Sequence, residues 1–260
     1  FDLPFLKDRG HFIPPNSLWI QSVLDSLSKD NTEVAAVVLV NPTYHGYSSD
    51  LASVIEKLHN FGLPVLVDEA HGTHFANCID SGLPKSALNA NADLVVNSLH
   101  KSCSGLSQTA VLWLRGNRVD PLAVERSLDL YQTSSPSSLL LASCESSLME
   151  LSQDVGKQKL KERITEARKI FQKLIKHGLP LLETNDPLRF ILHTAPFGIS
   201  GLEADEWFMA RGLVAELPEP GSLTFCLGLA KHHRLDQFII HKWKNYRPSI
   251  IKICFLCTLS

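Results

Sequence analysis

The stretch PVLVDEAHGTHF, which runs from Pro64 to Phe75, decides how this chain folds. Its first part, Val65-Leu66-Val67, is a short apolar run that ends at the carboxylate of Asp68, which is typical of a strand buried on both faces of a sheet. Similar runs occur upstream, VAAVVLV at Val34–Val40, and downstream, LVV at Leu94–Val96. The chain therefore contains at least three candidate strands of one buried sheet.

The segments around these runs predict how the strands connect. Ser48–Phe61 carries apolar residues at helical spacing and begins with Ser and Asp, and Gly62 and Pro64 after it favour a helix end. Strands that alternate with helices favour right-handed crossovers between parallel strands. Thr109–Leu114 follows the third run closely enough to pair with it as a hairpin. We therefore expect an α/β fold with a mainly parallel sheet flanked by helices.

The second half of the chain changes character. Ser135-Pro136 predicts the start of a helix with proline at its first position. Apolar residues at helical spacing from Leu160 to Leu174 predict a longer helix, which ends at Gly178-Leu179-Pro180. Beyond it, two strand-like runs flank a helical segment: Arg189–His193 and Leu223–Leu227, with Glu203–Arg211 between them. This pattern indicates a smaller α+β unit.

Three regions follow from these patterns. Residues 1–178 form the expected major domain, residues 179–230 form the start of a C-terminal α+β domain, and residues 231–260 form a basic tail. The tail carries six Lys or Arg residues and a single acid, Asp236.

The bulk composition excludes several classes of protein. With 260 residues, 44% of them hydrophobic, the chain can bury a sizeable core. A net charge of -2 gives no general attraction for nucleic acid or anionic membranes, so we expect neither as a partner. Six scattered cysteines indicate reduced thiols in an intracellular compartment, cytoplasmic or an organellar stroma or matrix. The first residue is Phe1, so a targeting segment is not observable.

The letters D-E-A-H also occur in helicases, where they hold a metal ion and an attacking water. A nucleotide site of that kind needs a G-x-x-x-x-G-K-[ST] loop, because backbone amides and a lysine must hold the triphosphate. The only Gly-Lys pair, Gly156-Lys157, lacks the leading glycine and lies in a helical stretch. His71 and His74 with Asp68 lack the spacing of a zinc site, so we expect no metal.

Asp68 and Lys101 offer a different chemistry. Each lies at the carboxyl end of a predicted buried strand, which is where open α/β sheets bind ligands. A lysine and a carboxylate placed in this way suit pyridoxal phosphate, because the lysine forms a Schiff base and the carboxylate pairs with the ring nitrogen. The nearby negative charge keeps that nitrogen protonated, and a protonated ring withdraws electrons from the substrate.

Several blocks of sequence resemble the Orn/Lys/Arg decarboxylase family of fold-type-I pyridoxal phosphate enzymes. They are VDEAHGTHF, LPKSALNANADLVVNSLHKSCSGLSQTAVL and QTSSPSSLLLASCE, followed by DPLRFIL and GLVAELPEPGSLTFCLGLA. The resemblance runs from about Val34 to Ala230 and implies part of the family's major domain with part of its smaller C-terminal domain.

The resemblance also implies roles for individual residues. The implied catalytic residues are Lys101, which would form the Schiff base, Asp68, which would pair with the pyridinium nitrogen, and His71, which would lie near the ring's phenolic oxygen. Ala70 would lie against one face of the ring.

The resemblance further implies phosphate contacts and a partner. Ser98 and His100 would reach the cofactor phosphate. Ser135-Pro136-Ser137 resembles the segment that one subunit offers to its neighbour's cofactor, so a homodimer or a higher homo-oligomer is implied. The family's phosphate-binding loop and stacking aromatic have no counterpart in residues 1–33, and the tail after Ala230 departs from the family's pattern. We therefore expect an N-terminally truncated member with an atypical tail.

The resemblance therefore implies decarboxylation of a basic amino acid, namely arginine, lysine or ornithine, to a polyamine-type amine and carbon dioxide. Two alternatives stay open. One is another fold-type-I activity such as aminotransfer. The other is a catalytically impaired relative that acts only through dimerisation. Tyr44 either lines the pocket or packs structurally.

Overall fold

The computed structural model describes residues 2–77, 82–230 and 234–257, with side chains as far as Tyr246. The chain forms two compact units, which we describe one at a time. The first comprises Phe1–Pro4 and Ile13–Lys161, and the second comprises Phe5–Phe12 and Glu162–Ser260. The boundary between the two units lies between Lys161 and Glu162, inside the long helix of residues 154–176. The sequence pattern placed the boundary at residue 178, just after this helix ends.

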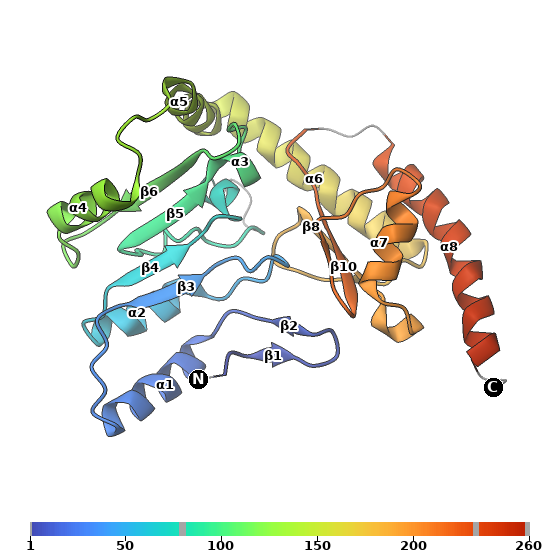
Figure 1. Ribbon diagram of the computed structural model, residues 1–260, viewed down its shortest axis with the longest axis horizontal. Coiled ribbons are helices and arrows are strands. Elements are labelled where there is room, and N and C mark those ends of the chain that lie inside the picture. The colour runs from blue at the N-terminus through green and yellow to red at the C-terminus, as the bar shows by residue number, and fades with distance from the viewer. Residues whose placement is uncertain (1, 78–81, 231–233, 258–260) are drawn as a thin grey trace. The chain divides into compact units, whose positions relative to one another are not determined.

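The first unit is an α/β structure built on a four-stranded sheet. Its elements are α1 (Ser17–Lys29), β3 (Val37–Val40), α2 (Leu51–Asn60), β4 (Val65–Asp68), η1 (Thr73–Asn77), β5 (Leu94–Ser98), α3 (Leu99–Ser102), β6 (Ala110–Leu114), α4 (Pro121–Tyr131) and α5 (Ser138–Ser152). The strands lie in the order β3-β4-β5-β6 (Figure 1). β3, β4 and β5 are parallel, and β6 pairs with β5 in an antiparallel hairpin. The expected mainly parallel sheet is confirmed.

Local sequence signals explain why α2 forms and which face it buries. The Asp50 side chain accepts a hydrogen bond from Ser53 N and so caps the helix. The apolar residues of α2 then lie on one face: Leu51, Val54, Ile55 and Leu58 are all at most 2% exposed. They join residues of α1 and of β3, β4 and β5 in one hydrophobic cluster. This packing holds the sheet that carries the candidate site.

Two expectations for the first unit are wrong in detail. We expected Val34–Val40 to be buried on both faces, but Val38 is 68% exposed and Val40 is 52% exposed. The reason is that β3 is an edge strand whose alternate residues point away from the cluster. We also expected a helix that opens at Ser135-Pro136, whereas α5 begins at Ser138 with Ser137 at its N-cap position.

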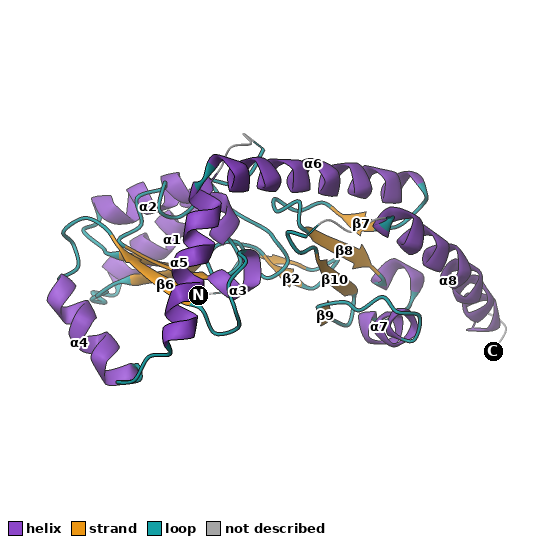
Figure 2. Ribbon diagram, turned by 90° about the horizontal axis from the view of Figure 1, so that it is seen from above, coloured by secondary structure: helices purple, strands orange, loops and turns teal. Residues whose placement is uncertain are grey.

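The second unit is an α+β structure. Its elements are β1 (Phe5–Leu6), β2 (His11–Phe12), the C-terminal part of α6 (Asp154–Lys176), β7 (Leu181–Leu182), β8 (Arg189–His193), η2 (Ala195–Phe197), α7 (Gly201–Met209), β9 (Leu217–Pro218), β10 (Ser222–Cys226) and α8 (Leu235–Cys257). The strands β7-β8-β10-β9 form an antiparallel sheet, with α6, α7 and α8 beside it (Figure 2). The predicted strands at 189–193 and 223–227 and the helix between them are present.

The basic tail has a structural role that its charge does not reveal. Within the expected 231–260 region, residues 231–233 and 258–260 lie outside the described residues, and α8 covers most of the rest. Ile239, Ile240, Trp243 and Tyr246 are buried in the core of the second unit, together with residues of α6 and α7. None of the helices in the described ranges is long and apolar enough to cross a membrane.

A buried carboxylate, Asp93, fixes the start of the central strands. Its Oδ2 accepts hydrogen bonds from His59 Nε2 and from Val65 N, both at 2.8 Å. Its Oδ1 lies 3.4 Å from Arg118 Nη1. Asp93 is 2% exposed, so the loss of this carboxylate would leave a buried backbone N–H without an acceptor.

We therefore expect Asp93→Ala to lower the free energy of unfolding by roughly 2–4 kcal/mol, because the buried Val65 N–H and the partly buried His59 imidazole lose their acceptor at once. The measurement is urea unfolding followed by circular dichroism. Asp129→Ala, on the exposed surface of α4, is the matched control and should change the free energy by less than about 0.5 kcal/mol. Equal effects of the two substitutions would contradict the anchoring role.

Candidate active site

Asp68 is the last residue of β4 and lies at the carboxyl edge of the sheet. It is in register with Val40 on β3 and with Val96 on β5. Its Oδ1 accepts a hydrogen bond from Ala70 N at 3.0 Å, which fixes the orientation of the carboxyl group. In the described part of the chain Oδ2 has no hydrogen-bond partner. The half-buried carboxylate therefore keeps one oxygen available for a cationic N–H donor.

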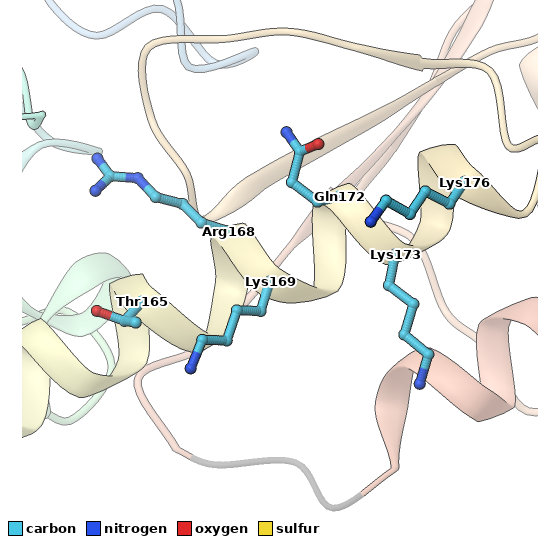
Figure 3. A pocket seen from close by; sticks show the side chains of 6 residues that line it. All are labelled: Thr165, Arg168, Lys169, Gln172, Lys173 and Lys176. Carbon is cyan, nitrogen blue, oxygen red and sulfur yellow. The ribbon is translucent and has the colours of Figure 1, made fainter.

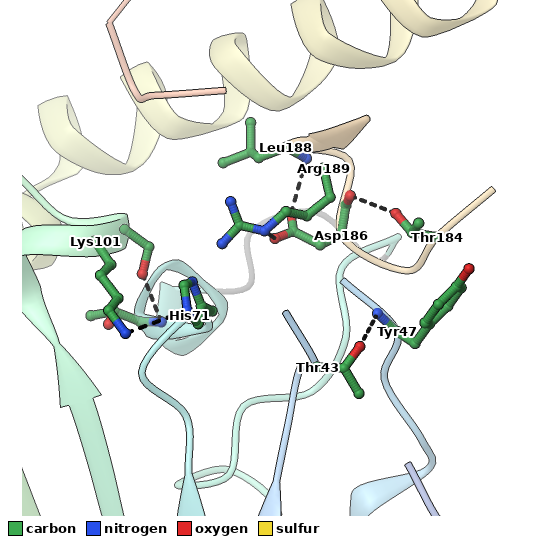
Figure 4. A network of polar contacts seen from close by, with 10 residues as sticks. Thr43, Tyr47, His71, Lys101, Thr184, Asp186, Leu188 and Arg189 are labelled. Carbon is green, nitrogen blue, oxygen red and sulfur yellow. Dashed lines mark hydrogen bonds and ion pairs between the residues drawn. The ribbon is translucent and has the colours of Figure 1, made fainter. Parts of the chain in front are cut away.

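Lys101 and His71 come together from two different strand ends. Lys101 lies in α3, a four-residue helix that continues directly from β5. Lys101 Nζ is 3.4 Å from His71 Nε2 (Figure 4). A charged lysine can only donate, so in that state the imidazole Nε2 is the acceptor. The structure therefore brings together two of the three predicted catalytic side chains.

Tyr44 packs against His71. The two rings meet edge to face, with centroids 4.5 Å apart. This contact helps to keep the imidazole in the orientation that faces Lys101. Of the two interpretations open for Tyr44, the geometry supports a residue that packs at the edge of the site.

The predicted phosphate contacts lie at the start of α3. Ser98 occupies the N-cap position, but its hydroxyl makes no capping hydrogen bond. His100 Nδ1 lies 2.9 Å from the Thr109 carbonyl oxygen, so Nδ1 must carry the proton that is donated there. The ring's Nε2 is then the atom that could reach a ligand. Ala70 is half-buried, and its methyl group is small enough to leave room beside Asp68.

Thr73 connects the two turns that carry these residues. Its backbone N–H donates to Ser102 Oγ, and its hydroxyl donates to the Ser98 carbonyl oxygen, both at 3.2 Å. Both bonds are buried, where a hydrogen bond restricts motion more than it does in water. The turn after β4 is therefore held against α3, which carries Lys101.

Glu69 is a feature of this region that the sequence interpretation missed. Its side chain is 0% exposed. Oε1 accepts from Ala87 N at 2.7 Å, and Oε2 accepts from Asn97 Nδ2 at 3.2 Å. Burial raises the pKa of this carboxyl to about 8, against the opposing effect of the two hydrogen bonds. The strand period could have indicated it, because Val65, Val67 and Glu69 alternate onto the same buried face.

The raised pKa predicts a pH dependence of stability. Between about pH 4.5 and about pH 8 the folded chain keeps a proton that the unfolded chain has lost, so the free energy of unfolding falls as the pH rises. Glutamine does not titrate, so only the wild type should lose stability in this window. We expect the free energy of unfolding of the wild type minus that of Glu69→Gln to decrease by roughly 1 kcal/mol per pH unit. Urea unfolding at pH 5, 6, 7 and 8 measures it. A pH-independent difference would contradict the assignment.

Two polar features of the second unit do not form a comparable site. His11 Nε2 lies 2.8 Å from Ser222 Oγ and 3.4 Å from Glu219 Oε2, but Ser222 is 0% exposed and no substrate could reach it. A groove along α6 is lined by polar and cationic side chains (Figure 3), namely Thr165, Arg168, Lys169, Gln172, Lys173 and Lys176. Lys173 forms an ion pair with Asp236 of α8.

Comparison of the sequence with known proteins shows which family the chain resembles. The family "Orn/Lys/Arg decarboxylase, major domain" matches residues 13–185. An arginine decarboxylase of Bacillus anthracis is 31% identical over 203 residues, which is 74% of this chain and 40% of that protein. The uncharacterised protein YaaO of Bacillus subtilis is 32% identical over 217 residues, or 80% of this chain and 44% of that protein.

Solved structures agree on the fold. The constitutive lysine decarboxylase of Escherichia coli superimposes with a TM-score of 0.70 at 17% identity, over 88% of this chain and 39% of that one. The chain spans less than half the length of the curated relatives it matches. The matched domain covers most of the first unit, including every residue of the candidate site. This chain therefore belongs to the Orn/Lys/Arg decarboxylase family.

Proposed function

We propose that the chain binds pyridoxal 5'-phosphate through Lys101 and belongs to an enzyme that decarboxylates a basic amino acid. The observation that carries the proposal is the placement of Asp68, His71 and Lys101 at adjacent strand ends, with Lys101 Nζ 3.4 Å from His71 Nε2. Family membership supports it, because several relatives carry the name arginine decarboxylase.

The residues of the site fit the chemical groups of this cofactor. An amine suits its aldehyde, and the oxygen of Asp68 that lacks a hydrogen bond suits a protonated ring nitrogen. The Ser98 hydroxyl, which caps no helix, and His100 Nε2 suit a phosphate. The small side chain of Ala70 leaves space for a flat ring.

When bound, the cofactor supplies the electron sink that stabilises the carbanion left by loss of carbon dioxide. The chain's residues supply binding and proton transfer. Lys101 is nucleophilic only as a neutral amine, and His71 Nε2 is close enough to take the proton that Lys101 must lose. The same pair can hold a proton for return to the substrate carbon. Asp68 would pair with the protonated ring nitrogen through its carboxylate.

The substrate class follows from the family, and we propose arginine, lysine or ornithine. The names of the Bacillus relatives favour arginine among these three. The rate of carbon dioxide release from each of the three amino acids, measured with cofactor present, ranks them as substrates. Keto-acid production in place of carbon dioxide would favour an aminotransferase instead.

The first test traps the cofactor on the chain. After incubation with pyridoxal phosphate and reduction with borohydride, we expect mass spectrometry to find the pyridoxyl group on Lys101. Lys101→Ala should lose at least about nine-tenths of the labelling, because it removes the amine that is proposed to bind the aldehyde. Lys29→Ala, an exposed lysine on α1, is the matched control. Equal labelling of the wild type, Lys101→Ala and Lys29→Ala would contradict the proposal.

We further propose that the chain works as a homodimer. None of the residues of α4 is buried, and Leu122, Leu130 and Tyr131 are 62%, 81% and 90% exposed. Leu139 and Leu141 of α5 are also more than half exposed. Exposed apolar residues gathered on neighbouring segments are typical of an interaction surface. Ser135-Pro136-Ser137, the segment expected to reach a neighbour's cofactor, is exposed between the two helices.

Sedimentation velocity tests the dimer. We expect Leu130→Glu to weaken self-association at least tenfold, because a charge buried in an apolar interface lacks a partner. Glu125→Gln, on the same exposed helix, should leave it nearly unchanged. A wild-type chain that stays monomeric at high concentration, or a Leu130→Glu variant that dimerises normally, would contradict this assignment.

A further inference from the structure

Glu69 belongs to a chain of buried hydrogen bonds that crosses three strands beneath the candidate site. Asn97 Nδ2 donates both to Glu69 Oε2, at 3.2 Å, and to the Glu69 carbonyl oxygen, at 3.1 Å. Asn97 Oδ1 accepts from Trp113 Nε1 at 2.9 Å. The chain therefore runs from the turn after β4, through the end of β5, to β6.

Two members of this network adjoin residues assigned to the cofactor. Glu69 lies between Asp68 and Ala70 in the sequence, and Asn97 directly precedes Ser98. The side chains of Asp68 and Glu69 leave the strand on opposite faces, since successive residues of a strand alternate. Glu69 can therefore influence the site only through the positions of its neighbours.

The turn that carries His71 is packed tightly against Glu69. Gly72 N donates to the Glu69 carbonyl oxygen at 2.9 Å. A Cβ atom on Gly72 would lie 2.7 Å from Glu69 Cγ and 2.7 Å from Pro42 Cδ, which is closer than side-chain atoms approach one another. His71 lies between Glu69 and Gly72 in this turn, so a displacement of Glu69 would move the backbone that carries the imidazole.

We propose that Glu69 is a positioning residue: its carboxyl group, through Asn97, fixes the end of β5 against the turn that follows β4. The inference rests on the proposed function in one respect, namely that Lys101 and Asp68 act on one cofactor. A carboxyl group suits the task because each of its oxygens accepts from a different donor, Ala87 N and Asn97 Nδ2.

Glu69→Gln is the sharpest test, because it keeps the volume and removes one acceptor. The glutamine oxygen can still accept from Ala87 N, but its amide NH₂ then faces the NH₂ of Asn97. Glu56→Gln, on the exposed face of α2 in the same unit, is the matched control. The first readout needs no cofactor: it is the NMR signals of the His71 imidazole and of the Trp113 indole N–H.

We expect Glu69→Gln to shift both signals while Glu56→Gln leaves them in place. The apparent Kd for pyridoxal phosphate, from borohydride trapping, should rise roughly tenfold in Glu69→Gln and stay within about twofold in the control. An unchanged His71 signal in folded Glu69→Gln overturns the inference. A wild type that takes up no cofactor refutes the proposed function alone, because the NMR comparison still decides the role of Glu69.

Trp113→Phe provides a second variant, for the case in which Glu69→Gln does not fold. It removes only the indole N–H at the far end of the network and keeps an aromatic ring in place. We expect a smaller shift of the His71 signal in the same direction. A folded Trp113→Phe protein whose His71 signal and cofactor affinity both match the wild type overturns the inference.

Discussion

The parallel pairing of β4 with β5 is the constraint on which the rest of the site depends. In a parallel pair the carboxyl ends of both strands meet at one edge of the sheet. That edge receives Asp68 from one strand and, through α3, Lys101 from the other. The cluster of apolar residues behind the sheet holds this pairing in place.

The site separates its charged groups from the groups that hold them. Asp68 is half-buried and Lys101 is exposed, so neither bears the full desolvation cost of a buried ion. The residues beneath them, Glu69, Thr73 and Asn97, are buried and are joined by hydrogen bonds. Buried polar groups that are joined by hydrogen bonds restrict the positions of their neighbours. The arrangement therefore places reactive groups on a rigid support.

Much of this structure could be predicted from the sequence because local signals carry it. The apolar runs predicted β4 and β5, and the helical spacing of Leu51 to Leu58 predicted α2. The exposure of β3 could not be predicted, because which strand lies at an edge depends on pairing between distant segments. The same holds for α8, whose buried face depends on the core of the second unit. For the site, the sequence identified the strand ends but not the Glu69 and Asn97 side chains that connect them.

We propose that Asp68 and Lys101 bind the same pyridoxal phosphate molecule. The most direct measurement is the ¹⁵N chemical shift of the cofactor's ring nitrogen, read from labelled cofactor bound to the chain at neutral pH. If they do, we expect a protonated nitrogen in the wild type and an unprotonated one in Asp68→Asn, because only the carboxylate stabilises the positive charge. The same unprotonated signal in both proteins would contradict it.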